Sequence, residues 1–290
     1  MNNISEIMED SPVTISPYVS VKSASEVMEK HRFGGLPVIN DGLIVGILTS
    51  RDVRRSHPNR LVADAMTKNV LTMPPETSLW EAREFIENNC IEHLMVANES
   101  KLLGIITKSL LNLEFGKQVD TLTGLYRSDY LYYMAVKLLQ IGTEIAVLFI
   151  DLDDFGAIDK EMGHVTGDVI LRQVAEAFKK VVDDRKDYLC RYAGDEFAVV
   201  TSRCLKDARK LGVMLLDSLA KQQWPNGINL NASIGIAGGR RGHQRPANER
   251  NAVSKLINLA SLGSAMAKTN NTRIFFVGQI EVVEDVGLRK

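Results

Sequence analysis

Apolar and polar positions in the first third of the chain follow one pattern twice. Residues 5–52 align with residues 63–110 without a gap, at a constant offset of 58. The clearest agreement is between residues 46–49 (GILT) and 104–107 (GIIT). Chance aligns apolar residues readily, but it seldom keeps glycine and threonine in phase as well. The pattern therefore indicates an internal duplication.

Each copy predicts the same order of elements, β-α-β-β. Apolar residues at helical spacing follow a capping-box pattern, Ser23-x-x-Glu26 in the first copy and Ser78-x-x-Glu81 in the second. Two β-branched runs come next, and Asn40-Asp41-Gly42 between them is typical of a tight turn. A unit of this size buries little surface alone, so we expect the two copies to pack together.

A connector follows the second copy. Residues 110–118 (LLNLEFGKQ) carry apolar side chains at helical spacing and lead directly into residues 120–125. This pattern predicts a short helix rather than a flexible linker. Such a helix would either pass rearrangements onward or simply cover the core of the first half.

The second half, from about residue 120 to 280, alternates between helical and β patterns. Residues 145–150 form a continuous apolar run, which predicts a strand buried on both faces. The predicted helices are 130–139, 167–182, 205–219 and 253–268, and the other predicted strands are 188–192, 197–201, 230–237 and 273–277. The whole chain thus reads as a mixed α/β (α+β) protein.

Acidic residues stand at a strand end and at a hairpin tip. The buried run ends in residues 151–154 (DLDD), and Asp195 and Glu196 lie between two β-prone runs. Carboxylates that converge suit Mg²⁺ or Mn²⁺, and such ions can activate a hydroxyl and neutralise a phosphoryl group. A solvated acidic turn explains the same residues, and the pattern alone favours it. No Walker loop, Ser/His/Asp set or zinc spacing competes.

Composition and charge exclude several classes of protein. The chain has 290 residues, of which 45% are hydrophobic and 24% charged, as in soluble proteins of about two domains. The net charge of −1 gives no reason to expect nucleic acid or a membrane as partner. The start, MNNISEIMED, lacks the pattern of a secretion signal, and the three cysteines are too scattered for a disulfide framework. We therefore expect a cytoplasmic protein.

The first half resembles a tandem pair of CBS domains, since both the order of elements and the ending G-h-h-T-x-x-D agree. In that family, the threonine and aspartate of the ending contact the ribose of an adenosine-type ligand. The first copy retains both, as Thr49 and Asp52, whereas the second has Leu110 in place of the acid. Leucine cannot accept a hydrogen bond. The resemblance thus implies one site for AMP, ADP or ATP; alternatively, the pair only dimerises and Asp52 supports a helix dipole.

The second half resembles a GGDEF domain, of the diguanylate cyclase family, over almost its full length. The resemblance rests on five motifs in order, at residues 120–125 (DTLTGL), 151–155 (DLDDF), 163–168 (GHVTGD), 191–197 (RYAGDEF) and 233–237 (SIGIA). It implies a palm-like fold with a mostly antiparallel sheet. It also implies that two GTP molecules, held by two domains, condense into cyclic di-GMP and pyrophosphate.

The same resemblance assigns site residues. Asp151, the backbone carbonyl of Leu152, and Glu196 match metal-holding positions for Mg²⁺ or Mn²⁺, and Asp195 matches an acid for metal binding and hydroxyl activation. Asp195 and Glu196 are therefore the expected catalytic pair. The expected GTP-binding residues are Phe155, Asp159, Asp168, Ala193, Gly194, Lys268 and Arg273.

Several positions depart from the family pattern. Gly156 stands where a phosphate-binding lysine is expected, and Thr272 stands where an arginine is expected, with Arg273 one place along. Asp159 replaces a guanine-contacting asparagine. Each lost charge-assisted contact weakens GTP binding by about 1.5–3 kcal/mol. The product-inhibition pattern Arg-x-x-Asp is absent, because residues 184–187 read DRKD, and we expect a solvated charge run there and only weak inhibition by cyclic di-GMP.

We therefore expect CBS domains at 1–58 and 59–115 and a GGDEF domain at 116–290, with a short helical connector at its start. The expected function is a diguanylate cyclase regulated by nucleotide binding to the CBS pair, working as a homodimer or higher homo-oligomer. The first alternative is a degenerate, non-catalytic GGDEF domain that senses GTP or cyclic di-GMP, with CBS-mediated dimerisation. The second is an adenine-nucleotide-binding scaffold without enzymatic output.

Overall fold

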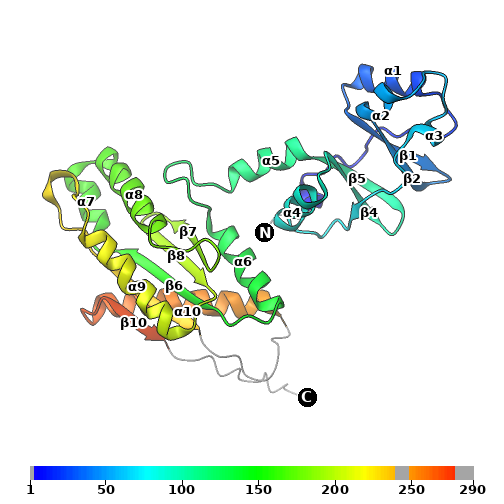
Figure 1. Cartoon of the computed structure of the whole chain (residues 1–290). Coiled ribbons are helices and arrows are strands. Elements are labelled where there is room, and N and C mark those ends of the chain that lie inside the picture. The colour runs from blue at the N-terminus through cyan, green and yellow to red at the C-terminus, as the bar shows by residue number, and fades with distance from the viewer. Residues whose placement is uncertain (1–2, 239–247, 278–290) are drawn as a thin grey trace, which may run out of the picture. The chain divides into compact units, whose positions relative to one another are not determined.

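The computed structural model describes residues 3–238 and 248–277. The chain folds into two compact units, Met1–Lys117 and Gln118–Lys290, which we describe separately (Figure 1). Both units mix helices with strands, as the sequence predicts. No helix in the described ranges has the length and apolar character needed to cross a membrane.

The duplication in the N-terminal unit is confirmed element by element. The helix and the two strands of the second copy have the bounds of the first copy shifted by 58 residues: α1 Val21–His31 and α4 Leu79–Asn89, β1 Gly35–Asn40 and β4 His93–Asn98, β2 Leu43–Thr49 and β5 Lys101–Thr107. The unit also contains η1 Ile4–Glu6, α2 Ser50–Arg55, α3 Val62–Ala65, β3 Thr72–Met73 and α5 Lys108–Lys117.

Both copies begin their first long helix with a serine N-cap, which corrects the predicted capping box at Ser23. Helix α1 has Ser20 as its N-cap, whose hydroxyl accepts the Ser23 N–H at 3.2 Å, so Ser23 lies inside the helix and does not form a box with Glu26. The predicted box of α4 is confirmed, because Ser78 accepts the Glu81 N–H at 3.2 Å and donates its own N–H to Glu81 at 3.0 Å. The repeat offset pairs Ser20 with Ser78.

The predicted turn between the two strands of the first copy is confirmed. Strands β1 and β2 are antiparallel, and Asp41 and Gly42 between them have φ of 49° and 80°. Both values lie in the left-handed region, which aspartate and glycine tolerate best. Strands β4 and β5 form the equivalent hairpin in the second copy.

The predicted connector is a helix, α5, which packs on its own unit. The ring of Phe115 meets Trp80 of α4 edge to face at 4.6 Å between centroids, and the guanidinium of Arg83 lies 4.6 Å from the Phe115 centroid. Leu111, one turn earlier, is also buried. The helix therefore covers the core of the N-terminal unit, as one of the two alternatives for this segment predicts.

The described residues of the C-terminal unit form one sheet of five strands in the order β10-β9-β6-β8-β7. All neighbours are antiparallel except β10 and β9. The sheet is thus mostly antiparallel, as the family resemblance implies. The strands are β6 Ala146–Leu152, β7 Asp187–Ala193, β8 Glu196–Thr201, β9 Ala232–Gly238 and β10 Ile274–Val277.

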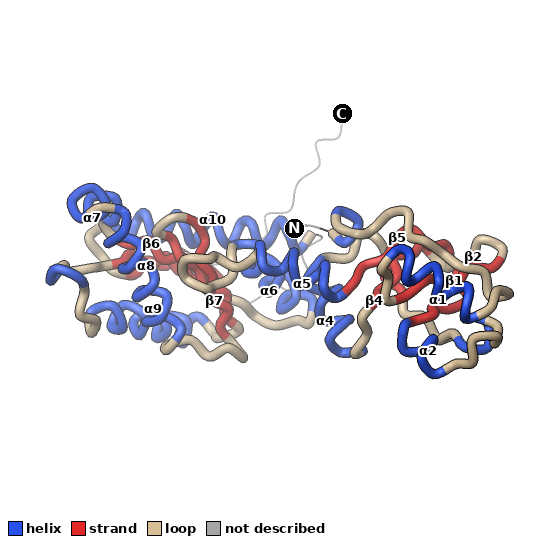
Figure 2. Tube along the Cα trace, turned by 90° about the horizontal axis from the view of Figure 1, so that it is seen from above, coloured by secondary structure: helices blue, strands red, loops and turns tan. Residues whose placement is uncertain are grey.

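Helices cover both faces of this sheet, which explains the continuous apolar run of β6. Helices α8 and α9 lie on one face of the sheet and α6 and α10 on the other (Figures 1 and 2). Leu148 and Ile150 of β6 belong to the core shared with α8 and α9, whereas Val147 and Phe149 belong to the core shared with α6 and α10. A strand with helices on both sides needs apolar residues at every position. The helices are α6 Ser128–Gln140, α7 Phe155–Met162, α8 His164–Lys179, α9 Leu205–Ala220, η2 Pro225–Gly227 and α10 Glu249–Thr269.

Helix α10 lies unusually close to β9. A Cβ atom on Gly235 of β9 would overlap the carbonyl oxygen of Ala260, and Gly263 of α10 faces the Cα of Gly235 at the same contact. Two glycines at this contact let helix and strand meet backbone to backbone. The contact fixes α10 against the centre of the sheet.

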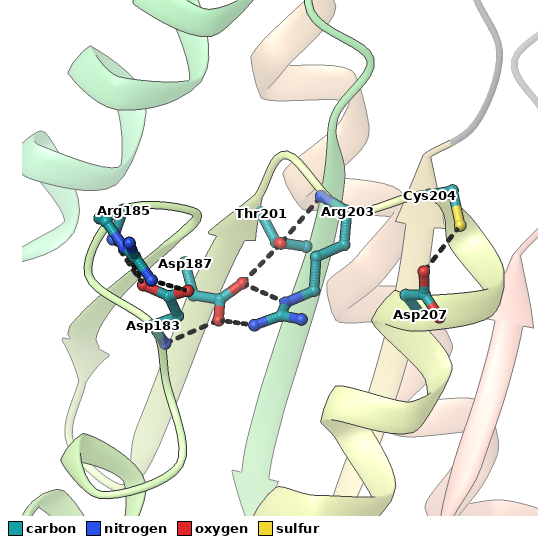
Figure 3. Close-up of polar contacts among 7 residues, drawn as sticks. All are labelled: Asp183, Arg185, Asp187, Thr201, Arg203, Cys204 and Asp207. Atoms are coloured by element: carbon teal, nitrogen blue, oxygen red, sulfur yellow. Dashed lines mark hydrogen bonds and ion pairs between the residues drawn. The ribbon is translucent and has the colours of Figure 1, made fainter.

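Residues 184–186 are exposed, as a solvated charge run predicts, but Asp187 is buried, which corrects that prediction at its last position. Asp187 is only 2% exposed, and its carboxylate accepts both Arg203 Nε and Nη2 at 2.8 Å (Figure 3). It also accepts the Thr201 hydroxyl at 2.7 Å and the Asp183 N–H at 2.9 Å. Arg185, by contrast, is exposed and pairs with Asp183. Asp187 therefore links the start of β7 to the end of β8.

Removal of the Asp187 charge should destabilise the C-terminal unit. Burial acts to raise the pKa of Asp187, but hydrogen bonds from Arg203, the Asp183 N–H and Thr201 outweigh it and lower the pKa. We expect Asp187→Asn to reduce the free energy of unfolding by roughly 3 kcal/mol, because it breaks a buried ion pair. Urea unfolding followed by Trp224 fluorescence, in a Trp80→Phe background, measures the change.

The same substitution should alter the pH dependence of stability. Because the pKa is lowered in the folded state, the contribution of Asp187 is present above about pH 4, the ordinary pKa of aspartate, and is lost as the pH falls below it. The loss in stability caused by Asp187→Asn should therefore shrink towards pH 3. A loss of equal size at pH 7 and pH 3 would contradict the assignment of the stabilisation to this charge.

Candidate functional site

The register of the central sheet brings the predicted acids together. Asp151, at the end of β6, lies directly opposite Glu196 at the start of β8 and opposite Ser233 of β9. Asp195 immediately precedes Glu196 in the turn between β7 and β8. The two predicted acidic segments, far apart in the sequence, thus form one acidic edge, which we define as Asp151, Asp153, Asp195 and Glu196.

The hairpin tip folds over the end of β6. The Leu152 N–H donates to the carbonyl oxygen of Asp195 at 3.4 Å. Gly194 has φ of 43°, and no described atom lies within 4 Å of where its Cβ would be. Ala193 is exposed beside it. The tip therefore presents open backbone at Ala193 and Gly194, as close approach of a ligand requires.

Arg191 holds this tip in place, a role that the sequence reasoning missed. Its Nε donates to the Gly194 carbonyl at 2.8 Å, and its Nη1 donates to Asp120 Oδ1 at 2.9 Å. The same oxygen accepts the Thr123 N–H at 2.9 Å and the Thr123 hydroxyl at 2.7 Å. The signal was present, because Arg191, Asp120 and Thr123 all belong to the matched motifs.

The charge on Asp120 is part of this contact. Burial acts to raise the pKa of Asp120, but hydrogen bonds from Thr123 and Arg191 outweigh it and lower the pKa. Asp120 therefore remains a carboxylate that can accept from both partners. The start of the C-terminal unit is thereby bonded to the hairpin that carries the acids.

The acids of this edge raise one another's pKa, and the cation Lys268 lies beside them. Burial and then the charge of Asp151 raise the pKa of Asp195; burial and then Asp151 and Asp195 raise the pKa of Glu196. Lys268 Nζ, from α10, lies 3.1 Å from Asp151 Oδ1 and 3.9 Å from Asp153 Oδ1. Burial acts to lower the pKa of Lys268, but its hydrogen bond to Asp151 and the nearby acids outweigh it and raise the pKa.

These oxygen donors fit a hard divalent cation. Carboxylates that raise one another's pKa gain most from a nearby positive charge, and Mg²⁺ and Mn²⁺ prefer oxygen ligands. Among the described residues, no three acid, histidine or cysteine side chains already enclose a metal-sized space. Asp151 is turned towards Lys268 instead. A cation would therefore compete with the lysine for this carboxylate.

The residues expected at the guanine end lie on α7 and α8. Asp159 Oδ2 is 2.9 Å from His164 Nδ1, while Asp159 Oδ1 is buried and has no hydrogen-bond partner. That oxygen lies against Gly167, the neighbour of the exposed Asp168. Phe155, in contrast, is only 7% exposed and packs in the core beneath α7. The sequence did not predict α7, since its acids and Gly156 obscure the helical pattern.

Arg273 is not brought into contact with Lys268 or with the acidic edge in the described part of the chain. Its Nη2 donates to Asn231 Oδ1 at 3.4 Å. Thr272, where the arginine was expected, donates its hydroxyl to the Ala267 carbonyl at 3.5 Å, at the end of α10. Asn231 therefore places the Arg273 side chain beside the start of β9.

The N-terminal unit contains a pocket of 730 Å³ at the ending of the first repeat. Thr49 and Asp52 both line it. The Thr49 N–H and hydroxyl donate to Asp52 Oδ2 at 2.8 and 2.6 Å, so Asp52 also caps α2. Asp52 can therefore both stabilise the start of α2 and line the pocket.

The second repeat has an equivalent pocket of only 100 Å³. Phe33 and Arg32 line it at positions where the larger pocket has Ile91 and Cys90, 58 residues later. The smaller pocket is therefore lined by bulkier side chains at these two positions. At the ending of the second repeat, the Leu110 N–H donates to the Thr107 hydroxyl.

Comparison with known protein families supports the resemblances stated for both halves of the chain. Residues 117–269 match the family described as "Diguanylate cyclase, GGDEF domain", and residues 4–58 and 62–111 each match "CBS domain". The diguanylate cyclase DosC of Shigella sonnei is 39% identical over 101 residues, which are 33% of this chain and 22% of that protein. Inosine-5′-monophosphate dehydrogenase of Korarchaeum cryptofilum is 42% identical over 97 residues, 33% of this chain and 20% of that protein.

A solved structure shows the same fold. The coiled coil and GGDEF domain of DgcB from Caulobacter crescentus, in complex with c-di-GMP, superimposes with a TM-score of 0.51 at 17% identity. The match covers 69% of this chain and 97% of that one. The chain spans about a fifth of the length of the first curated relatives that it matches. From the matched motifs, the sheet and the family descriptions together, the chain belongs to the diguanylate cyclase GGDEF family and carries two CBS domains before its GGDEF domain.

Proposed function

We propose that the GGDEF domain is an active diguanylate cyclase, which joins two GTP molecules into cyclic di-GMP and two pyrophosphates. The observation that carries this proposal is the acidic edge, where Asp151 and Glu196 face each other across β6 and β8 with Asp195 beside them. The 39% identity to a protein named as a diguanylate cyclase supports it. The proposed domain limits are 1–58, 59–115 and 116–290.

Asp151, the Leu152 carbonyl, Asp195 and Glu196 would hold Mg²⁺ or Mn²⁺, which lowers the charge of the phosphates and the pKa of a bound hydroxyl. Asp195, in the turn beside Glu196, is the proposed proton acceptor. In the proposed reaction the 3′-hydroxyl of one GTP loses its proton to Asp195 and its oxygen bonds to the α-phosphorus of the other GTP. The bond from that phosphorus to the bridging oxygen breaks, and pyrophosphate leaves.

The remaining residues would bind and orient GTP. Lys268 is placed to exchange Asp151 for a phosphate oxygen, and Ala193 and Gly194 leave room for phosphate at the hairpin tip. The exposed Asp168 is the proposed acceptor for an N–H of guanine, with the half-buried Asp159 close by. Phe155 packs beneath α7, and Arg273 lies beside β9. Both would support the proposed GTP site.

The substituted positions predict weak binding of GTP. Gly156 offers no charge where the family has lysine, and the side chain of Thr272 is directed to a backbone carbonyl. Each missing charge-assisted contact lowers affinity by about tenfold or more, at roughly 1.5–3 kcal/mol per contact. This observation also favours the second candidate function, a non-catalytic sensor of GTP or cyclic di-GMP.

The proposed regulation acts through the CBS pair. Because each cyclase step uses two GTP-loaded domains, the working unit is a homodimer or a higher homo-oligomer. The larger pocket, with Thr49 and Asp52, would bind AMP, ADP or ATP. A ligand changes output only if it binds the active and inactive arrangements with different affinities. Helix α5, which ends at the boundary between the two units, is the proposed carrier.

Glu196→Gln should reduce the synthesis of cyclic di-GMP by at least about 100-fold, because it removes a charge from the proposed cation site while retaining size. Purified protein is incubated with Mg²⁺ and GTP and the products are separated by chromatography. Glu176→Gln, an exposed glutamate on α8, is the matched control and should keep full activity. Retention of most activity in Glu196→Gln would reject the role of this residue. A wild-type protein that binds GTP without turnover would support the sensor alternative.

Lys268→Met should raise the KM for GTP by about tenfold, since one charge-assisted phosphate contact is lost. Lys268→Arg should recover part of the effect because it restores a cation. Lys255→Met, an exposed lysine on the same helix, serves as the control and should leave the KM unchanged. Steady-state kinetics at several GTP concentrations measures both constants. An unchanged KM in Lys268→Met would contradict phosphate binding by this side chain.

Calorimetric titration with AMP, ADP and ATP should reveal one strong site per chain. Asp52→Ala should weaken that site by about tenfold, since a charge-assisted hydrogen bond to the ribose is removed. Asp64→Ala, an exposed acid on α3, should have no effect. Two equivalent strong sites per chain, or unchanged binding in Asp52→Ala, would contradict the assignment. Binding without any change in GTP turnover would remove the regulatory role alone.

A further inference from the structure

Three arginines line the larger pocket of the N-terminal unit. Arg51, Arg54 and Arg55 all belong to α2, the short helix that follows Thr49. All three side chains are exposed, and none forms a salt bridge within residues 3–238 and 248–277. Because residues three and four apart lie on one side of a helix, Arg51 stands next to both of the others. The pocket therefore has a wall with three positive charges along α2.

The duplication shows that these charges are not a requirement of the fold. At the offset of 58, the positions of Arg51, Arg54 and Arg55 are occupied by Ser109, Asn112 and Leu113. The second copy also begins a helix, α5, directly after its last strand, without any of these cations. The arginines are thus particular to the copy whose pocket is open.

The two carboxylates that line the pocket do not cancel this charge. Asp52 accepts the N–H and hydroxyl of Thr49 through one oxygen, at the beginning of α2. Glu92 lies beside His93, in the wall formed by the second copy. Burial lowers the pKa of the His93 imidazole, so this histidine adds no positive charge near neutral pH. The arginines therefore dominate the part of the pocket that continues from Asp52 along α2.

We propose that this pocket selects a nucleoside di- or triphosphate over a monophosphate or a free nucleoside, and that Arg51, Arg54 and Arg55 bind the phosphate chain. The proposal rests on the proposed nucleotide site at Thr49 and Asp52. The larger pocket, at 730 Å³, is in the size range of small-molecule sites. If Asp52 holds the ribose, the 5′ substituent has the adjoining α2 surface available to it.

The chemistry of guanidinium groups gives the direction of the preference. Arginine binds phosphate oxygens through two parallel N–H bonds, and each additional phosphate brings further negative charge to the three side chains. A neutral nucleoside leaves three like charges unpaired on one short helix. Affinity should therefore increase with the number of phosphates, and the increase should diminish at high salt because the arginines are exposed.

The test is calorimetric titration of the full chain with adenosine, AMP, ADP and ATP, in EDTA so that turnover is prevented. We expect ATP and ADP to bind at least tenfold more tightly than AMP, and AMP more tightly than adenosine. The triple variant Arg51→Gln, Arg54→Gln, Arg55→Gln should lose at least tenfold in ATP affinity and keep the affinity for adenosine. Retained adenosine binding also shows that the variant is folded.

The matched control is Arg60→Gln, which removes an exposed arginine from the same unit outside the pocket and should leave ATP binding unchanged. Raising the salt concentration tenfold should weaken ATP binding in the wild type, but adenosine binding should remain the same. A triple variant that binds ATP as tightly as the wild type overturns the proposal. Equal affinities for AMP and ATP overturn it as well, although the nucleotide site itself would stand.

A parallel series with guanosine, GMP, GDP and GTP tests the preference for adenine separately from the preference for a polyphosphate. If only the guanine series binds, with the same dependence on phosphate number and on the three arginines, the phosphate assignment stands and the adenine assignment falls. Binding at the GGDEF domain is distinguished by Asp52→Ala, which affects only the pocket in the N-terminal unit. Absence of binding by both series would reject the nucleotide site and the polyphosphate preference together.

Discussion

The two-sided burial of β6 is the constraint on which the C-terminal unit depends. Leu148 and Ile150 fill one core, and Val147 and Phe149 fill the other. A slip of one residue would exchange the two sets between faces that are packed by different helices. The register is therefore strongly specified, and it sets Asp151 opposite Glu196. The position of the acids follows from the packing of apolar residues that have no chemistry of their own.

A second contact converts this position into a site. Arg191 bonds both to the carbonyl of Gly194 and to Asp120, which is itself bonded to Thr123. The hairpin tip is thus attached to the first turn of the unit as well as to its own strands. Since the chain reaches Asp120 directly from α5, a displacement of that turn would be felt first at the hairpin through Arg191. In the proposed regulation, this contact would carry such a displacement to the acidic edge.

Much of this arrangement was predictable from the sequence, and the exceptions have physical causes. The repeat offset of 58 correctly places the long helices and strands of both copies, and the apolar run 145–150 correctly predicts a doubly buried strand. The prediction of a capping box at Ser23 was wrong because the N-cap of α1 is Ser20, the residue that the repeat aligns with Ser78. The burial of Asp187 depends on Arg203, a partner across the hairpin that local charge patterns do not reveal. The bond between Arg191 and Asp120 joins residues 71 positions apart, so only the folded sheet shows it.

The bulk of Phe33 and Arg32 in the smaller pocket has a consequence for how the chain would respond to concentration. Two equal pockets in one unit could influence each other and sharpen the response within a single chain. One open pocket gives simple saturation, in which occupancy changes gradually over a wide range of ligand concentration. Any steeper, switch-like dependence must then arise between chains, where the occupied pocket of one subunit alters its neighbour. With one pocket reduced, cooperative binding of the ligand would arise between the chains of the proposed oligomer and not between the two copies within one chain.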